Sequence, residues 1–179
     1  MSDQYRTASA PYHGPTFFSV EETRTTHPSI QGDHVHHVVR HPGGAAVVAV
    51  DGSDVLCVMQ YRPAVRQLLV ELPAGRIEPG ETPAETAERE LLEETGYVAD
   101  HIQALFNFYN APCFCDGVTH LFMATGLRRA PGLVETGIPL TVQRIALHDV
   151  RPFIQQGRIT DAKTIIGLLT AMETMRRPL

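Results

Sequence analysis

The stretch Gly75-Arg-Ile-Glu-Pro-Gly-Glu-Thr-Pro-Ala-Glu-Thr-Ala-Glu-Arg-Glu-Leu-Leu-Glu-Glu-Thr-Gly-Tyr97 combines a loop with one short helix that carries several carboxylates. Thr82 is a good N-cap, and Glu85, three residues further on, completes a capping box. Pro83 suits the first helical position, and Gly96 suits a left-handed C-terminal stop. The sequence therefore predicts a helix from about residue 83 to residue 95, with Ala84, Ala87 and Leu91 as its apolar stripe.

The face next to this stripe is acidic. Glu90 and Glu94 lie four residues apart, where like charges destabilise a helix by a few tenths of a kcal/mol, and Glu93 adds to the repulsion. Arg89 can pair with Glu93 one turn on, but one arginine cannot neutralise three carboxylates. A hard divalent cation is the natural counter-charge, and Mg²⁺ takes few carboxylates and prefers substrate phosphates as its other ligands. The alternative is a solvated acidic face. Glu81, at the mouth of the helix, is expected to brace the structure.

The full spacing resembles the Nudix box, which is glycine, five residues, glutamate, seven residues and then Arg-Glu-apolar-any-Glu-Glu-any-Gly-apolar. The matching positions are Gly75, Glu81, Arg89, Glu90, Leu91, Glu93, Glu94 and Gly96, with Tyr97 as a loose match at the last position. The resemblance implies an α/β fold, a Nudix-type α/β/α sandwich with a mixed sheet, in which the box forms loop, helix and loop. It also implies a hydrolase of nucleoside diphosphates that are linked to another moiety.

Residues outside the box resemble the ADP-ribose pyrophosphatase branch of the family. They are Met59-Gln60-Tyr61-Arg62-Pro63, Glu71-Leu72-Pro73-Ala74-Gly75, Pro112 and Asp161-Ala162-Lys163-Thr164. The branch implies Mg²⁺-dependent hydrolysis, with Mn²⁺ as a substitute, of ADP-ribose or a related nucleoside diphosphate sugar to a nucleoside monophosphate and a sugar phosphate. Two alternatives stay open: a pyrophosphatase for a different nucleotide sugar, and a catalytically impaired ligand-binding module that kept the Nudix fold.

Metal and catalytic roles follow from the acidic face. Glu90 and Glu94 are the first choices as metal ligands, because their spacing lets both reach one cation. The resemblance adds the carbonyl oxygen of Ala74. Glu93 is a candidate for a shared ligand or for the group that activates water, with Arg89 orienting it. A plain ion-pair partner is the alternative role for Glu93.

Substrate binding is expected to use cations and aromatic side chains. Arg62 would contact the phosphates or the terminal ribose, Arg76 in the box loop is a second candidate, and the resemblance adds Pro112. Tyr61 or Phe18 are candidates to stack on adenine, although aromatic residues in strands more often pack in a core.

The sequence departs from the branch after Pro112. The branch usually has a Gly-Phe-Ser-Asp-Glu type of run there, whose glutamate helps to bind metal or activate water, whereas this chain has Cys113-Phe-Cys-Asp-Gly117. Asp116 is the nearest substitute and is a candidate catalytic residue, and Glu135 in the following loop is another. The identity of the general base is therefore open, and a missing base typically lowers the rate 10²–10⁴-fold.

Composition bounds the class of protein. The chain has 179 residues, of which 43% are hydrophobic and 20% charged, as in a soluble globular protein. A net charge of −5 argues against nucleic acid as a partner. No stretch approaches the length of a membrane span, and the start of the chain does not resemble a signal peptide. With only three cysteines, we expect a cytoplasmic protein.

Periodicity divides the chain into an N-terminal strand region, residues 1–43, and a Nudix hydrolase domain, residues 44–179. Strands are expected near residues 17–24, 34–39, 45–50, 55–61, 68–71, 101–109, 118–125 and 141–147, and two further helices near 150–156 and 161–175. The family packs such an N-terminal element against a partner subunit, which implies a homodimer. The histidines at 34, 36, 37 and 41, and Cys113, Cys115 and His120, lack the paired spacing of a structural zinc site.

Overall fold

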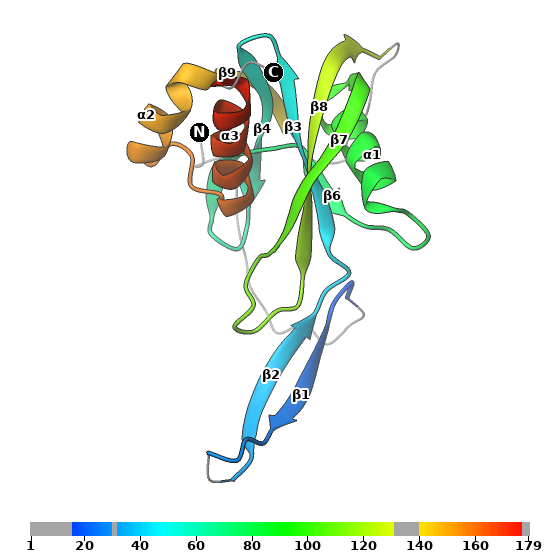
Figure 1. Ribbon diagram of the computed structural model, residues 1–179, viewed down its shortest axis with the longest axis vertical. Coiled ribbons are helices and arrows are strands. Elements are labelled where there is room, and N and C mark those ends of the chain that lie inside the picture. Colours follow the sequence, from blue (N-terminus) through cyan, green and yellow to red (C-terminus); the bar gives the residue numbers. More distant parts are fainter. Residues whose placement is uncertain (1–15, 30–31, 131–139, 177–179) are drawn as a thin grey trace.

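The computed structural model describes residues 16–29, 32–130 and 140–176. Figure 1 shows the arrangement of its elements. In chain order they are β1 (Ser19–Thr25), β2 (His34–Arg40), β3 (Gly44–Asp51), β4 (Asp54–Arg62), β5 (Gln67–Glu71), β6 (Ala74–Arg76), α1 (Pro83–Thr95), β7 (Tyr97–Tyr109), β8 (Val118–Arg129), β9 (Leu140–Ala146), the 3-10 turn η2 (Leu147–Asp149), α2 (Val150–Gln155) and α3 (Ala162–Arg176).

A seven-stranded mixed sheet forms the centre of the molecule, with the strand order β5-β4-β3-β8-β7. β6 pairs with β3, and β9 pairs with β4. The pairing of β3 with β8 is parallel, while the other pairings are antiparallel. This confirms the expected α/β class with a mixed sheet.

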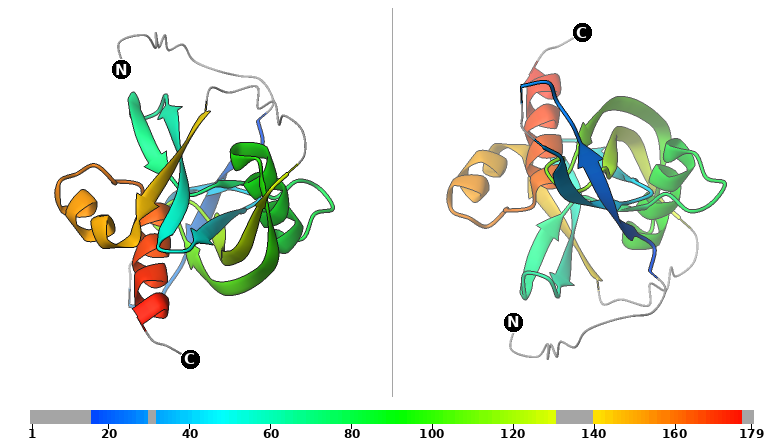
Figure 2. Two further views of the ribbon diagram at one scale, coloured as in Figure 1. Left: turned by 90° about the horizontal axis from the view of Figure 1, so that it is seen from above. Right: turned by 90° about the horizontal axis from the view of Figure 1, so that it is seen from below.

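The two faces of the sheet are covered by different helices, as Figure 2 shows for α1 and α3. Alternation along β3 explains this, because successive side chains of a strand point to opposite faces. Ala46 and Val48 are buried in the cluster that includes Leu168 of α3. Val47, by contrast, belongs to the cluster that includes Leu91 of α1. A strand that is apolar on both faces, as β3 is, suits this central position.

The hairpin of β3 and β4 opens at one end. The two strands pair only next to their turn, between residues 49–51 and 54–56. Beyond that point β3 pairs with β6, whereas β4 pairs with β5 and β9. The first residues of β3 and the last residues of β4 therefore belong to separate ladders, and both line the cleft described below.

The N-terminal strands β1 and β2 form a separate two-stranded antiparallel sheet. Figure 1 shows this hairpin projecting from one end of the molecule. It is tied to the loop before β8, because Val39 N donates to Phe114 O at 2.7 Å and Asp116 N donates to Val39 O at 3.1 Å. Most side chains of the hairpin are exposed.

Several sequence expectations need correction. β6 was not expected, β7 begins at Tyr97 rather than near residue 101, and β8 runs on to Arg129. Ala84 is exposed, and Thr86 and Glu90 are buried on α1 instead. Thr86 is accommodated because its hydroxyl donates to Glu81 at 2.8 Å. In the part of the chain that the structure describes, no helix is long and apolar enough to cross a membrane.

Candidate functional site

The caps of α1 form as the sequence predicts. Thr82 Oγ1 accepts a hydrogen bond from Glu85 N at 3.3 Å, and the Glu85 carboxylate accepts one from Thr82 N at 2.7 Å. At the other end Gly96 adopts φ 73° and donates to Leu92 O at 2.8 Å. Both ends of the acidic helix are therefore fixed by local interactions.

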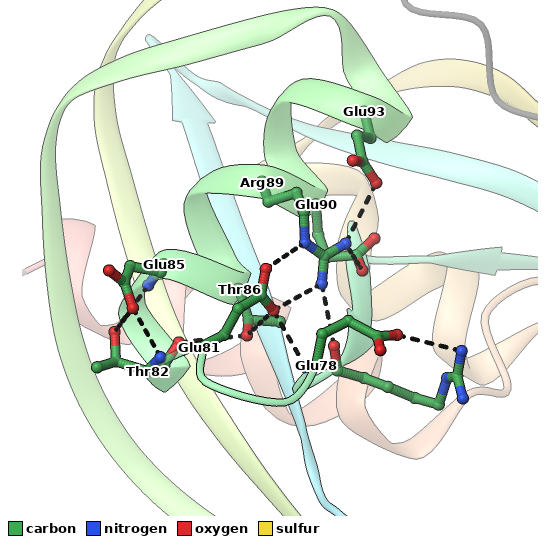
Figure 3. A network of polar contacts seen from close by, with 9 residues as sticks. Glu78, Glu81, Thr82, Glu85, Thr86, Arg89, Glu90 and Glu93 are labelled. Carbon is green, nitrogen blue, oxygen red and sulfur yellow. Dashed lines mark hydrogen bonds and ion pairs between the residues drawn. The ribbon is translucent and has the colours of Figure 1, made fainter. Parts of the chain in front are cut away.

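Arg89 is the hub of the polar network around α1, as Figure 3 shows. Its Nε and Nη2 donate to the two oxygens of Glu81, at 2.7 and 3.0 Å. Its Nη1 donates to Glu90 at 2.6 Å and to Glu93 at 3.2 Å. The predicted pairing of Arg89 with Glu93 is present, but Glu81 receives the bidentate contact. Glu81 thus braces the helix against its preceding loop, and this pairing lowers its pKa to about 2.

Glu90 is a buried carboxylate of the helix, and Glu94 is a half-buried one. Burial raises the pKa of Glu90, although the neighbouring Arg89 opposes the rise. Burial raises the pKa of Glu94 to about 7, against the effect of a 3.0 Å hydrogen bond from Ala74 N to its Oε2. The negative charge of Glu90 adds to the rise at Glu94. The positive charges of Arg89 and Arg62 therefore offset the effect of burial on these two carboxylates only in part.

The donor set fits a hard divalent cation. Carboxylate oxygens and a nearby backbone carbonyl are the ligands that Mg²⁺ and Mn²⁺ prefer, and a cation would relieve the raised pKa values. Among the described residues, however, no three His, Cys, Asp or Glu side chains converge as a ready metal site. Glu90 and Glu93 are instead engaged by Arg89, because both accept a hydrogen bond from its Nη1.

A cleft of about 600 Å³ joins these groups. It brings together six of the residues that the sequence predicts for the site, namely Arg62, Ala74, Arg76, Arg89, Glu90 and Glu94. Glu93 does not line this cleft. Its side chain is 46% exposed, and its carboxylate lies 3.2 Å from Nη1 of Arg89. The predicted metal ligands on α1 therefore divide into two carboxylates that line the cleft, Glu90 and Glu94, and one exposed carboxylate, Glu93.

Asp116 and Pro112 are not brought to this cleft. Both line a different hollow, of about 400 Å³, between the β1–β2 hairpin and the loop before β8. The Asp116 carboxylate accepts from His41 N at 2.8 Å and from Arg40 at 3.2 Å. The hydrogen bond from His41 N lowers the pKa of Asp116, and the pairing with Arg40 lowers it further. Asp116 therefore fastens the hairpin to the loop. Glu135 lies outside the described residues.

Gly117 leaves room for His41. A Cβ atom at position 117 would lie 3.3 Å from the ring of His41, which lines the cleft. The His41 ring packs edge-on to Phe17, with centroids 5.3 Å apart, and the Arg76 guanidinium lies 4.5 Å from the Phe17 centroid. Burial lowers the pKa of His41, and Arg76 lowers it further. Phe17 therefore stands in the cleft, which lacks Tyr61 and Phe18.

The sequence reasoning missed other cleft residues, above all Gln60 and Lys163. Lys163 pairs with the buried Glu71, 92 residues earlier in the chain, which also pairs with Arg62. All of these residues stand in three of the runs that resemble the ADP-ribose pyrophosphatase branch. That resemblance was a usable signal, but it gave no indication that the three runs meet.

Comparisons with known proteins agree with this geometry. The model of the NUDIX domain matches residues 40–158. The chain is 39% identical over 135 residues to the methanol dehydrogenase activator of Bacillus methanolicus, covering 73% of this chain and 72% of that protein. It is 38% identical over 135 residues to the ADP-ribose pyrophosphatase of Bacillus subtilis, with the same coverage, 73% and 72%. It is 32% identical over 166 residues to the ADP-ribose pyrophosphatase of Mycobacterium tuberculosis, covering 90% of this chain and 80% of that one.

A solved structure described as an ADP compounds hydrolase has the same fold. It superposes with a TM-score of 0.74 over 94% of this chain and 97% of that one, at 20% sequence identity.

Proposed function

The chain belongs to the Nudix family, and we propose that it hydrolyses ADP-ribose or a related nucleoside diphosphate sugar in the presence of Mg²⁺. Water adds to one phosphorus of the diphosphate and the bridging P–O bond breaks, which gives a nucleoside monophosphate and a sugar phosphate. The observation that carries this proposal is the cleft that two carboxylates of the box helix, Glu90 and Glu94, line together with Arg62 and Arg76. Two ADP-ribose pyrophosphatases among the relatives support the choice of substrate.

Divalent metal is a general requirement of Nudix hydrolases, and here we propose Mg²⁺, with Mn²⁺ as a substitute. Glu90, Glu94 and the carbonyl oxygen of Ala74 would hold it, with Glu93 as a further ligand. The bound cation would neutralise charge on the diphosphate and lower the pKa of water. Arg89 holds the carboxylate of Glu90, and Ala74 N holds that of Glu94, so both side chains are fixed by the protein.

The remaining roles are the activation of water and the binding of the substrate. Glu93 is our choice for the group that takes the proton from water, because its carboxylate is exposed and its only side-chain contact described here is Arg89. Arg89 orients Glu93, while Arg62 and Arg76 bind the substrate. Phe17 offers an aromatic face beside Arg76 for the base.

We also propose that the protein is a homodimer in the cytoplasm. The β1–β2 hairpin pairs only with itself among the described strands and is largely exposed, and an isolated two-stranded sheet is marginally stable. Residues 1–43 would form this dimerisation element and residues 44–179 the catalytic domain. Three free cysteines support a reducing compartment. Light scattering before and after deletion of residues 1–40 tests the dimer, and a monomeric mass for both proteins would refute it.

Turnover on a panel of nucleoside diphosphate compounds with Mg²⁺ or Mn²⁺ tests the activity. Alkaline phosphatase can report it, because it releases phosphate from the monoester products but not from the diphosphate diester. We expect turnover of ADP-ribose by the wild type and a loss of about 10²–10⁴-fold in Glu93→Gln. A wild type that binds these compounds without turnover would favour the ligand-binding module, for which the absence of a glutamate at position 117 is the structural reason.

A further inference from the structure

The β4 end of the cleft is formed by residues of β4 and α3. Gln60 and Arg62 lie two residues apart on β4, so their side chains point to the same face of the strand, and both line the cleft. Lys163, near the start of α3, lines it too and shares the partner Glu71 with Arg62. This part of β4 has separated from β3 and pairs with β5 and β9 instead.

Glu71 holds the two cations of this end in place. Glu71 is buried, with 1% of its surface exposed. Arg62 donates to both Glu71 oxygens, Nε at 2.6 Å and Nη2 at 2.8 Å, and Lys163 Nζ donates to one of them. Burial alone would raise the pKa of Glu71, but the contacts with Arg62 and Lys163 outweigh burial and lower it. Glu71 is therefore ionised and fixes both cations by charged hydrogen bonds.

Gln60 is the unusual member of the group. It is only 5% exposed. Among the described residues its side-chain amide has no hydrogen-bond partner, and because no buried side-chain nitrogen or oxygen there lacks a partner, the amide opens onto the cleft that Gln60 lines. An amide that opens onto a cleft can exchange water for a ligand group that reproduces its hydrogen bonds. An amide both donates and accepts, as a hydroxyl does. It is thus suited to recognise a group rich in hydroxyls.

The charges of this end cancel. Arg62 and Lys163 are balanced by Glu71 and by Asp161, whose carboxylate lies 3.0 Å from Lys163 Nζ. A neutral cluster with fixed donors does not concentrate phosphate by net charge, but it presents N–H groups to oxygen atoms that carry no charge. The substrate has such atoms in the sugar beyond the second phosphate.

We propose that Gln60 and Lys163, together with Arg62, form the subsite for the distal sugar of the substrate, and that Glu71 is the positioning residue of this subsite. The inference rests on the proposed function for the choice of a nucleoside diphosphate sugar. It adds the residues that recognise the second half of that molecule. The C-terminal helix thereby becomes part of the binding site.

Binding of two uncleavable analogues in Mg²⁺, measured by calorimetry, tests the subsite. One is ADP-ribose with a methylene group in place of the bridging oxygen, and the other is the corresponding ADP analogue, which lacks the distal ribose. In Gln60→Leu and Lys163→Met we expect affinity for the ADP-ribose analogue to fall about tenfold. Affinity for the ADP analogue stays within about twofold, because the adenosine and phosphate contacts remain. Gln143→Leu, on β9 outside the cleft, is the matched control and leaves both affinities unchanged.

If these side chains had only a structural role, the substitutions would lower the affinity for both analogues equally. That result would overturn the proposed subsite. Equal affinity of the wild type for the two analogues would overturn it as well. Turnover of ADP-ribose by the wild type, measured in parallel, separates the two hypotheses. If the variants lose affinity for the ADP-ribose analogue alone while the wild type shows no turnover, the subsite is supported and the hydrolase is refuted. If the wild type binds neither analogue, both hypotheses are refuted.

Discussion

A Cβ atom at Gly75 would lie 1.8 Å from Oε1 of Glu90. The first glycine of the box therefore has a steric purpose: it lets the backbone of β6 approach the buried carboxylate of α1. The neighbouring Ala74 N bonds to Glu94 at 3.0 Å, so the same short strand contacts both glutamates.

Gly75→Ala should displace the Glu90 carboxylate from the cleft. We expect the affinity for Mn²⁺, measured by electron paramagnetic resonance, to fall at least about tenfold and turnover to fall with it, since charged contacts of this kind contribute about 1.5–3 kcal/mol. Gly52→Ala, in the turn between β3 and β4, is the control, because it changes a glycine that has nothing within 4 Å of its added Cβ. It strains a residue with φ 64° and should lower stability while leaving Mn²⁺ affinity as in the wild type.

Arg89→Lys removes the planar fork that joins Glu81 to Glu90. A lysine cannot reproduce a bidentate contact, so we expect a lower melting temperature, by roughly 2–6 °C, and slower turnover. Arg128→Lys is the control, because Arg128 is an exposed arginine paired with Asp100. It should change neither the melting temperature nor the turnover measurably. Equal melting temperatures for the two variants would contradict the bracing role of Arg89.

Glu94 should make the metal-free protein less stable as the pH rises. Its pKa is about 7 in the folded chain, above the ordinary value of 4.5 for a glutamate, so the folded state binds the proton more tightly than the unfolded state. The resulting stability is present below pH 4.5 and is lost as the pH rises through about 7. Glu94→Gln keeps a neutral side chain at every pH and should melt a few degrees above the wild type at pH 8, without metal, but not at pH 5.

Calorimetric melting in a chelator checks this, with Glu88→Gln on the exposed face of the same helix as the control. Adding Mg²⁺ at pH 8 should raise the melting temperature of the wild type more than that of Glu94→Gln. A wild type and a Glu94→Gln variant with parallel pH profiles would be incompatible with a half-buried, protonated Glu94.

Asp116→Asn should leave turnover within about threefold of the wild type. The Asp116 carboxylate faces Arg40 and His41 N rather than the cleft, and an asparagine oxygen can still accept a hydrogen bond. Steady-state kinetics with ADP-ribose and Mg²⁺ measure this. A loss of about 10²-fold or more, the range typical of a removed general base, would restore Asp116 as the catalytic base.

Local sequence was sufficient to predict the box helix. The caps of α1 and the i,i+4 spacing of its glutamates depend on residues only a few positions apart. The resemblance of the box implied the class of fold, and the alternating and continuous apolar runs predicted most of the strands. They could not predict β6, because three residues form a strand only when β3 lies beside them.

Tertiary structure decided which carboxylates are buried and what each charged group faces. The raised pKa of Glu94 comes from burial against the sheet, and no periodicity within α1 distinguishes it from the exposed Glu93. The pairing of Glu71 with Lys163 joins residues 92 positions apart. The partners of Asp116, His41 N and Arg40, likewise lie 75 and 76 positions earlier in the chain. Burial and long-range pairing depend on how the elements pack, and this is why they had to be read from the fold.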